Sequence, residues 1–136
     1  MKRFRFRLDA LLRLKQRKRQ EAEQLFASCQ RDLIAGIDAL GRLDERLGQG
    51  FTTHDPQLIR TEEAFLGRLR VERRAQAERV AELQKRLQKA SEAMLQAKRE
   101  EESVLSLRDK AKAAWRKDAL KEVQSQLDDL GYRSGL

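Results

Sequence analysis

Apolar residues recur at alternating steps of three and four along most of the chain, which is the spacing of a coiled-coil seam. Before residue 48, one seam position holds Leu12, Phe26, Leu33, Leu40 and Leu47, and its companion holds Leu8, Ala22, Cys29 and Leu43. After residue 55, the same two positions hold Ile59, Leu66, Val80, Leu87 and Met94, and then Leu69, Leu83, Ala90, Ala97 and Val104. The repeat is interrupted by Arg19, Gly36, Arg73 and Gln76, so two registers of pairing stay open.

One cluster of helix breakers divides this pattern into two arms. Gly48, Gly50 and Pro56 lie together in the segment LGQGFTTHDPQ, which holds the chain's single proline. Asp55 is suited to cap the second helix, with proline at its first position. Gly131 predicts the end of that helix. We therefore expect helices over about residues 5–47 and 56–130, joined by a turn at 48–55.

Two helices with apolar seams and a short connection predict an all-α fold, an antiparallel two-helix coiled coil with a longer C-terminal helix. The whole chain, residues 1–136, is then one elongated helical hairpin. The arms are unequal, at about 65 Å and about 110 Å for a rise of 1.5 Å per residue. A turn centred near residue 52 would place Leu8 beside a residue between about 94 and 101.

That arrangement leaves residues 100–130 without a partner in their own chain. The stretch nevertheless carries an apolar stripe, formed by Val104, Leu107, Ala111, Ala114, Leu120, Val123, Leu127 and Leu130. An unpaired amphipathic helix of this length indicates a docking surface, or a segment that is disordered when free. Trp115 lies on the same stretch with nothing of its own to cover, which makes it a candidate for contact with a partner.

The net charge is concentrated at the beginning of the chain. The first 20 residues hold nine Lys/Arg side chains against one acid, Asp9, and this excess of +8 equals the net charge of the whole protein. A basic end on an otherwise neutral helical chain favours an acidic partner surface. Three of the arginines alternate with Phe4 and Phe6. That alternation suits a protein groove, stacking on nucleic-acid bases, a membrane interface or a solvated tail.

The sequence offers no constellation typical of an enzyme. His54 is the only histidine and Cys29 the only cysteine, so neither a metal site nor a nucleophile with its base can be assembled from them. We predict no catalytic residue, no metal and no cofactor. No apolar run approaches the length of about 18 residues that a membrane span needs. The chain has no recognisable targeting segment, and the lone cysteine favours a cytoplasmic location.

The opening FRFRLDALLRLKQRKRQEAE resembles that of the flagellar export protein FliJ family. The shared features are alternating Phe and basic residues, then Leu-x-x-Leu-Leu, then a helix of mixed charge. Here they fall at Phe4, Phe6, Leu8, Leu11, Leu12, Leu14 and Glu21. The length, the central break and the two long helices match along the whole chain. Stalk proteins of virulence type III secretion systems are similar in architecture.

The resemblance implies a non-enzymatic stalk and chaperone component of the flagellar type III protein export apparatus. Such a protein places its paired ends in the pore of the hexameric export ATPase, contacts the cytoplasmic domain of the export gate and escorts export chaperones. By this resemblance the ATPase side comprises Phe4, Phe6, Leu8, Arg13, Arg17, Leu120, Val123 and Leu127. The gate contact falls on Phe65 and Leu69, taken as an exposed apolar pair. The protein would be cytoplasmic and peripheral at the inner membrane, with no nucleic-acid partner.

Two other functions agree with the same residues. The basic arm can serve a coiled coil that binds nucleic acid or an anionic membrane, with salt-sensitive affinity. Alternatively, residues 100–130 pair with a second copy of the chain and build a homo-oligomeric scaffold.

Overall fold

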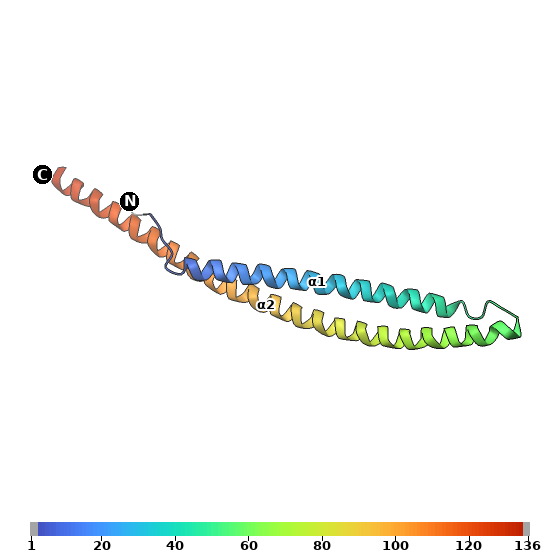
Figure 1. The fold of residues 1–136 in the computed structure, drawn as a ribbon. Coiled ribbons are helices and arrows are strands. Elements are labelled where there is room, and N and C mark those ends of the chain that lie inside the picture. The colour runs from blue at the N-terminus through green and yellow to red at the C-terminus, as the bar shows by residue number, and fades with distance from the viewer. Residues whose placement is uncertain (1–2, 135–136) are drawn as a thin grey trace. The chain divides into compact units, whose positions relative to one another are not determined.

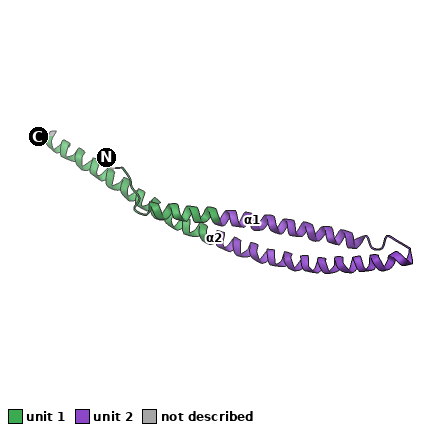
Figure 2. Cartoon of the chain, viewed as in Figure 1, with its two compact units in different colours: residues 1–21, 95–136 green, residues 22–94 purple. Residues whose placement is uncertain are grey.

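Two long helices make up almost all of the computed structural model, which describes residues 3–134. They are α1 (Asp9–Gly48) and α2 (Pro56–Ser134), and this described range contains no strand (Figure 1). The chain divides into two compact units (Figure 2). Unit 1 combines residues 1–21 with 95–136, and unit 2 comprises residues 22–94. The predicted all-α class with two long helices is confirmed.

The helix boundaries differ from the expected ones at two places. Helix α1 begins at Asp9 rather than near residue 5, because residues 3–8 are not helical and the first backbone bond of the helix joins Leu12 N to the Leu8 carbonyl at 2.9 Å. Gly131 does not end α2, which continues to Ser134. A glycine stops a helix where it adopts a positive φ. Within residues 3–134 only Gly50 does so, at φ 65°, just after the end of α1.

The start of α2 is capped as predicted. The Asp55 carboxylate accepts a hydrogen bond from the Gln57 amide at 3.0 Å, and the Asp55 carbonyl accepts the Ile59 amide at 3.0 Å. Pro56 occupies the first helical position, where no amide hydrogen is needed. The cap therefore fixes where the loop ends and α2 begins.

In unit 2 the two helices lie side by side and antiparallel, packed along the predicted seam (Figure 1). The buried apolar side chains of this unit are all seam residues: Leu66, Leu69, Val80, Leu83 and Ala90. Large apolar side chains outside the seam are exposed, with Ile34 at 54% and Val71 at 70%. The burial pattern selects one of the two registers that the sequence leaves open.

Two interruptions of the seam fit each other. Gly36 is buried, and a Cβ atom at this position would lie 2.9 Å from Leu83 Cδ1. Gln76 Nε2 donates a hydrogen bond to the Gly36 carbonyl at 3.0 Å. The missing side chain thus gives room to Leu83 and Gln76, and the glutamine amide gains a partner inside the interface.

The register differs from that of a turn centred near residue 52. Asp44, four residues before the end of α1, forms an ion pair with Arg73, which lies 17 residues after the start of α2. The loop is therefore not a symmetric turn: it runs back beside the first turns of α2, where Thr52 bonds to Glu62. In unit 1, Lys15 pairs with Glu100, so Leu8 is level with about residue 107. The expected position beside residues 94 to 101 is wrong.

We expect Gly36→Leu to destabilise the protein by about 1–3 kcal/mol, because the new side chain would collide with Leu83 in a filled seam. Gly41→Leu is the matched control on the same helix. Gly41 is exposed, and a Cβ atom added there would meet nothing within 4 Å, so leucine should stabilise the helix by about 0.5–1 kcal/mol. Urea unfolding followed by circular dichroism measures both. Equal stabilisation by the two substitutions would contradict the packing at Gly36.

Candidate functional site

Unit 1 carries the entire charge excess of the protein. It contains 18 basic and 10 acidic residues, whereas unit 2 contains 12 of each. The +8 that the sequence places in the first 20 residues thus belongs to a unit whose α2 part is nearly neutral. A partner with an acidic surface would be attracted to unit 1.

Residues 3–8, called here the N-terminal strap, precede α1 and are not helical, and a hydrogen bond from the Asp9 amide to the Phe6 carbonyl at 3.2 Å closes a turn at residues 7–8. Along it exposure alternates strictly: the three arginines at odd positions are exposed, whereas Phe4, Phe6 and Leu8 are half-buried. The apolar side chains of the strap are therefore partly covered within unit 1, whereas its three arginines are open to solvent.

Trp115 of α2 is the contact that holds the beginning of the strap. The rings of Phe4 and Trp115 have centroids 5.8 Å apart and are tilted by 55°. Such a tilted pair contributes about 0.5–1.5 kcal/mol beyond the area it buries. The expectation that Trp115 has nothing of its own to cover is therefore wrong. Trp115 occupies the same seam position as Glu101, two heptads further along α2, and its ring covers Phe4.

Polar groups join α1 to α2 in the same unit. Lys15 Nζ donates to Glu100 Oε2 at 3.0 Å, and this bond is the main cause that holds the pKa of Glu100 below its ordinary value. Arg19, predicted as an interruption of the seam, forms an ion pair with Glu101, which is 9% exposed. Val104 nearby is 5% exposed. The expectation that the stretch beginning at residue 100 has no partner in the chain is wrong for this part.

The remainder of the predicted stripe is exposed. Leu120 is 71% exposed, Val123 40% and Leu127 61%. Counted in heptads from Glu101 and Val104, these three residues fall on the opposite side of α2 from the seam. The stripe that the sequence suggests as one surface is thus two: a covered seam that reaches Trp115, and an exposed face beyond it.

The two predicted ATPase-contacting arginines lie on the outside of α1. Arg13 is exposed and pairs with Asp9 one turn earlier, at 2.9 Å. Arg17 is exposed as well. Together with the arginines of the strap they give unit 1 a row of accessible cations that begins before the helix and continues along it.

The predicted exposed pair in unit 2 needs a correction. Phe65 is 41% exposed, and the Arg46 guanidinium lies over its ring at 5.2 Å from the centroid. Leu69 is only 3% exposed because it occupies the seam. Its side chain is part of the packing between the helices, and Phe65 alone reaches the surface.

The loop next to Phe65 is tied to α2 by the carboxylate of Glu62, a contact that the sequence did not predict. Thr52 Oγ1 donates to Glu62 at 2.5 Å, and the amides of Thr52 and Thr53 donate at 3.3 and 3.4 Å. These bonds, the Thr52 hydroxyl first, hold the pKa of Glu62 below its ordinary value. They close a small groove lined by Arg46, Gln49, Gly50, Thr52, Glu62, Phe65 and Leu66.

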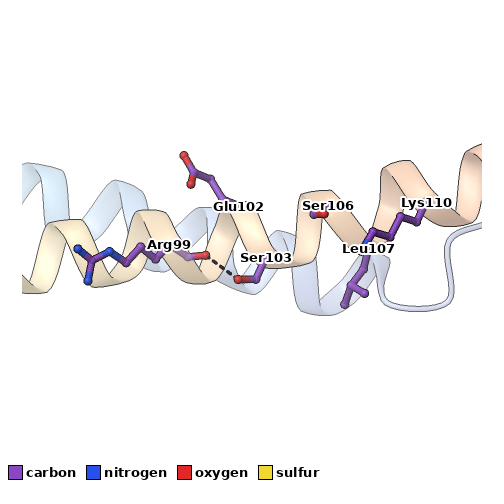
Figure 3. A pocket seen from close by; sticks show the side chains of 6 residues that line it. All are labelled: Arg99, Glu102, Ser103, Ser106, Leu107 and Lys110. Carbon is purple, nitrogen blue, oxygen red and sulfur yellow. Dashed lines mark hydrogen bonds between the residues drawn. The ribbon is translucent and has the colours of Figure 1, made fainter.

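A second groove runs along α2 in unit 1 (Figure 3). It is lined by Arg99, Glu102, Ser103, Ser106, Leu107 and Lys110, all from one helix. Ser103 Oγ donates to the Arg99 carbonyl at 2.9 Å, so the hydroxyl is engaged with its own helix. In the part of the chain that the structure describes, no cluster of three His, Cys, Asp or Glu residues suits a metal ion. Over the same residues, neither helix has an apolar stretch long enough to cross a membrane.

Comparison with protein families gives a match over nearly the whole chain. The model of the flagellar FliJ protein family matches residues 4–135. The chain belongs to the FliJ family. Neither a curated protein nor a solved structure gives a significant match. FliJ membership makes the protein a component of the flagellar export apparatus, and the match includes the strap from Phe4 onward as well as both helices.

We expect Phe4→Ala to expose Trp115, because the phenyl ring is its contact in the strap. Trp115 is the only tryptophan, so its emission should move to longer wavelength and become more accessible to acrylamide. Phe51→Ala is the control, since Phe51 lies in the loop of unit 2 and is 52% exposed. Identical emission from Phe4→Ala and the unchanged protein would show that the strap does not lie on α2.

Proposed function

We propose that this FliJ-family chain is a non-enzymatic stalk of the flagellar export apparatus, which docks unit 1 against the hexameric export ATPase and stimulates it. In the same proposal, unit 2 contacts the cytoplasmic domain of the export gate near Phe65, and the chain assists export chaperones. The protein would work in the cytoplasm, peripheral at the inner membrane through the apparatus.

The observation that carries the ATPase contact is the charge distribution. All of the excess positive charge belongs to unit 1, where Arg13 and Arg17 are exposed on the outer side of α1. The exposed face of α2 at Leu120, Val123 and Leu127 belongs to the same unit. A unit that carries both a cationic surface and an exposed apolar face suits a partner with an acidic surface that can also bury apolar side chains.

We expect the double substitution of Arg13 and Arg17 by glutamine to weaken binding to the export ATPase by about tenfold at low salt. Stimulation of ATP hydrolysis at a fixed protein concentration should fall with it. The matched control replaces Arg42 and Arg60 by glutamine, since both are exposed in neutral unit 2. Equal losses in the two variants, or full stimulation by the first, would exclude docking through this surface.

The gate contact is supported by the exposed ring of Phe65 and its setting. Arg46 covers one face of the ring, and the loop anchored on Glu62 forms the neighbouring wall of the groove. A half-exposed aromatic ring next to a shallow groove provides an anchor of the kind that dominates protein interfaces.

We expect Phe65→Ala to reduce binding to the cytoplasmic domain of the export gate by about tenfold or more, as for a contact residue worth above 1.4 kcal/mol. ATPase stimulation should be unchanged by this substitution. Phe51→Ala serves as control because Phe51 is an exposed aromatic residue of the loop before α2. Gate binding that survives Phe65→Ala would remove this surface from the proposal.

A further inference from the structure

The first turn of α1 begins without a side-chain cap. The Leu8 carbonyl accepts the first backbone bond of the helix, from the Leu12 amide at 2.9 Å, so leucine occupies the capping position. Leucine offers no side-chain acceptor for the free amides of a first turn and is disfavoured there. The strap also contains neither glycine nor proline. Its residues are therefore compatible with a helix, and neither a cap nor a helix breaker sets the place where α1 begins.

The turn at residues 7–8 keeps the strap close to a helical path. The Asp9 amide donates to the Phe6 carbonyl at 3.2 Å, and within residues 3–134 only Gly50 has a positive φ. A hydrogen-bonded turn with negative φ at both central residues is of type I, whose dihedral angles lie near those of a helix. Continuing α1 toward the N-terminus thus requires a backbone change at Phe6 and the residues before it, with little change at the turn.

The aromatic rings of the strap favour the non-helical form. Phe4 and Phe6 are both half-buried, and the centroids of the Phe4 and Trp115 rings are 5.8 Å apart. On a helix, residues two apart point in directions that differ by about 200°. A helical strap could therefore turn only one of its two phenylalanines toward α2. The observed conformation covers a ring that a longer α1 would expose.

The charge of the strap opposes the helix as well. Arg3, Arg5 and Arg7 are exposed, and within residues 3–134 none of them forms an ion pair. Cations at a helix N-terminus are disfavoured, because the free amides and the helix dipole already place positive partial charge there. A longer α1 would hold these arginines in its first turns. Unlike the aromatic contact, this opposition disappears when an acidic surface neutralises the arginines.

A longer α1 would bring Phe6 onto the cationic face of unit 1. Arg13 and Arg17 follow Phe6 by 7 and 11 residues, and on a helix both spacings return to within about 20° of the same direction. Both arginines are exposed on the outer side of α1. The helical form thus places an aromatic ring in line with two arginines, and these are the residue types that dominate protein interfaces.

We propose that the N-terminal strap is a conformational switch with a hidden aromatic anchor. While its arginines are unpaired, the strap stays non-helical, packs Phe4 on Trp115 and keeps Phe6 half-buried. When an acidic partner surface neutralises the arginines, α1 extends through the strap and presents Phe6 to that partner. The inference deepens the proposed function, on which it rests only for the export ATPase as the partner.

Backbone chemical shifts of the full chain test the switch without a partner. In two variants the three strap arginines are replaced together, first by glutamine and then by glutamate. The ratio of helical to non-helical strap, taken from the Cα shifts of residues 4–8, should rise about fivefold or more with glutamine and further with glutamate. The charge-matched control replaces Arg42, Arg60 and Arg74 by glutamate, since all three are exposed in unit 2. Its strap shifts should stay unchanged.

Two results of this measurement would overturn the switch. A strap that stays non-helical in the glutamate variant would show that its charge does not hold the helix back. An equal gain of helix in the control would reduce the effect to net charge.

The use of the helical form in docking is tested by fixing the turn. Arg7 is the second residue of the type I turn, where proline is favoured. Proline also disfavours the helical conformation of the residue before it, which is Phe6. We expect Arg7→Pro to bind the export ATPase about tenfold more weakly than Arg7→Gln, which loses the same charge and keeps a free backbone. Circular dichroism shows whether both variants have folded.

The anchor is tested by combining substitutions. Phe6→Ala alone should weaken ATPase binding about as much as Arg7→Pro, and Phe6→Ala added to Arg7→Pro should cause no further loss, because both remove the same contact. Equal affinities of Arg7→Pro and Arg7→Gln, or losses that add in the combined variant, would disprove the role of the switch in docking. If the unchanged protein did not bind the ATPase, the proposed function would fail, and the shifts of the free protein would still decide whether the strap switches.

Discussion

The antiparallel register of α1 on α2 is the constraint on which the other features depend. Apolar seam residues stabilise the pairing of the two helices. They also tolerate a shift of one helix by one heptad, because residues such as leucine and alanine recur from heptad to heptad. Polar groups inside the seam do not tolerate it, since a displaced partner would leave a buried charge or amide unsatisfied. Glu101 with Arg19 in unit 1, and Gln76 with the Gly36 carbonyl in unit 2, are such groups.

In unit 1 this register decides which residues meet. With Lys15 level with Glu100, the residues before α1 fall beside the part of α2 that contains Trp115. The strap thereby gains an aromatic contact, and its arginines remain on the outside. A shift by one heptad would carry Phe4 about 10 Å along α2, away from the only tryptophan. The basic surface of the protein is consequently a product of the helix pairing as much as of the charge in the sequence.

The features that the sequence predicted correctly are local ones. The seam follows from the spacing of its apolar residues, and the start of α2 follows from Asp55 and Pro56, whose capping chemistry involves only the next few residues. Gly131 was a misleading signal, because glycine permits a left-handed stop without enforcing one. The spacing placed Leu69 correctly in the seam, and only the family resemblance treated it as an exposed residue.

The features that sequence reasoning missed depend on contacts between distant residues. The path of the loop is set by the hydrogen bond between Thr52 and Glu62. No sequence motif predicts that a threonine hydroxyl will bind a carboxylate ten residues later. The contact of Phe4 with Trp115 joins two residues that lie far apart in the sequence. Whether these two rings meet depends on the register of the helices, and the sequence leaves two registers possible. The same dependence explains why the apolar stripe of α2 was taken as one surface rather than two.

A charge-exchange cycle at Arg19 and Glu101 tests the register most directly. Arg19→Glu and Glu101→Arg should each lower the free energy of unfolding by about 3 kcal/mol, because each leaves like charges facing each other in a largely buried position. The exchanged double variant should recover most of that loss, measured by urea unfolding, since the pair is re-formed with its signs reversed. Losses that simply add in the double variant would show that the two residues do not meet and that α1 pairs with α2 in a different register.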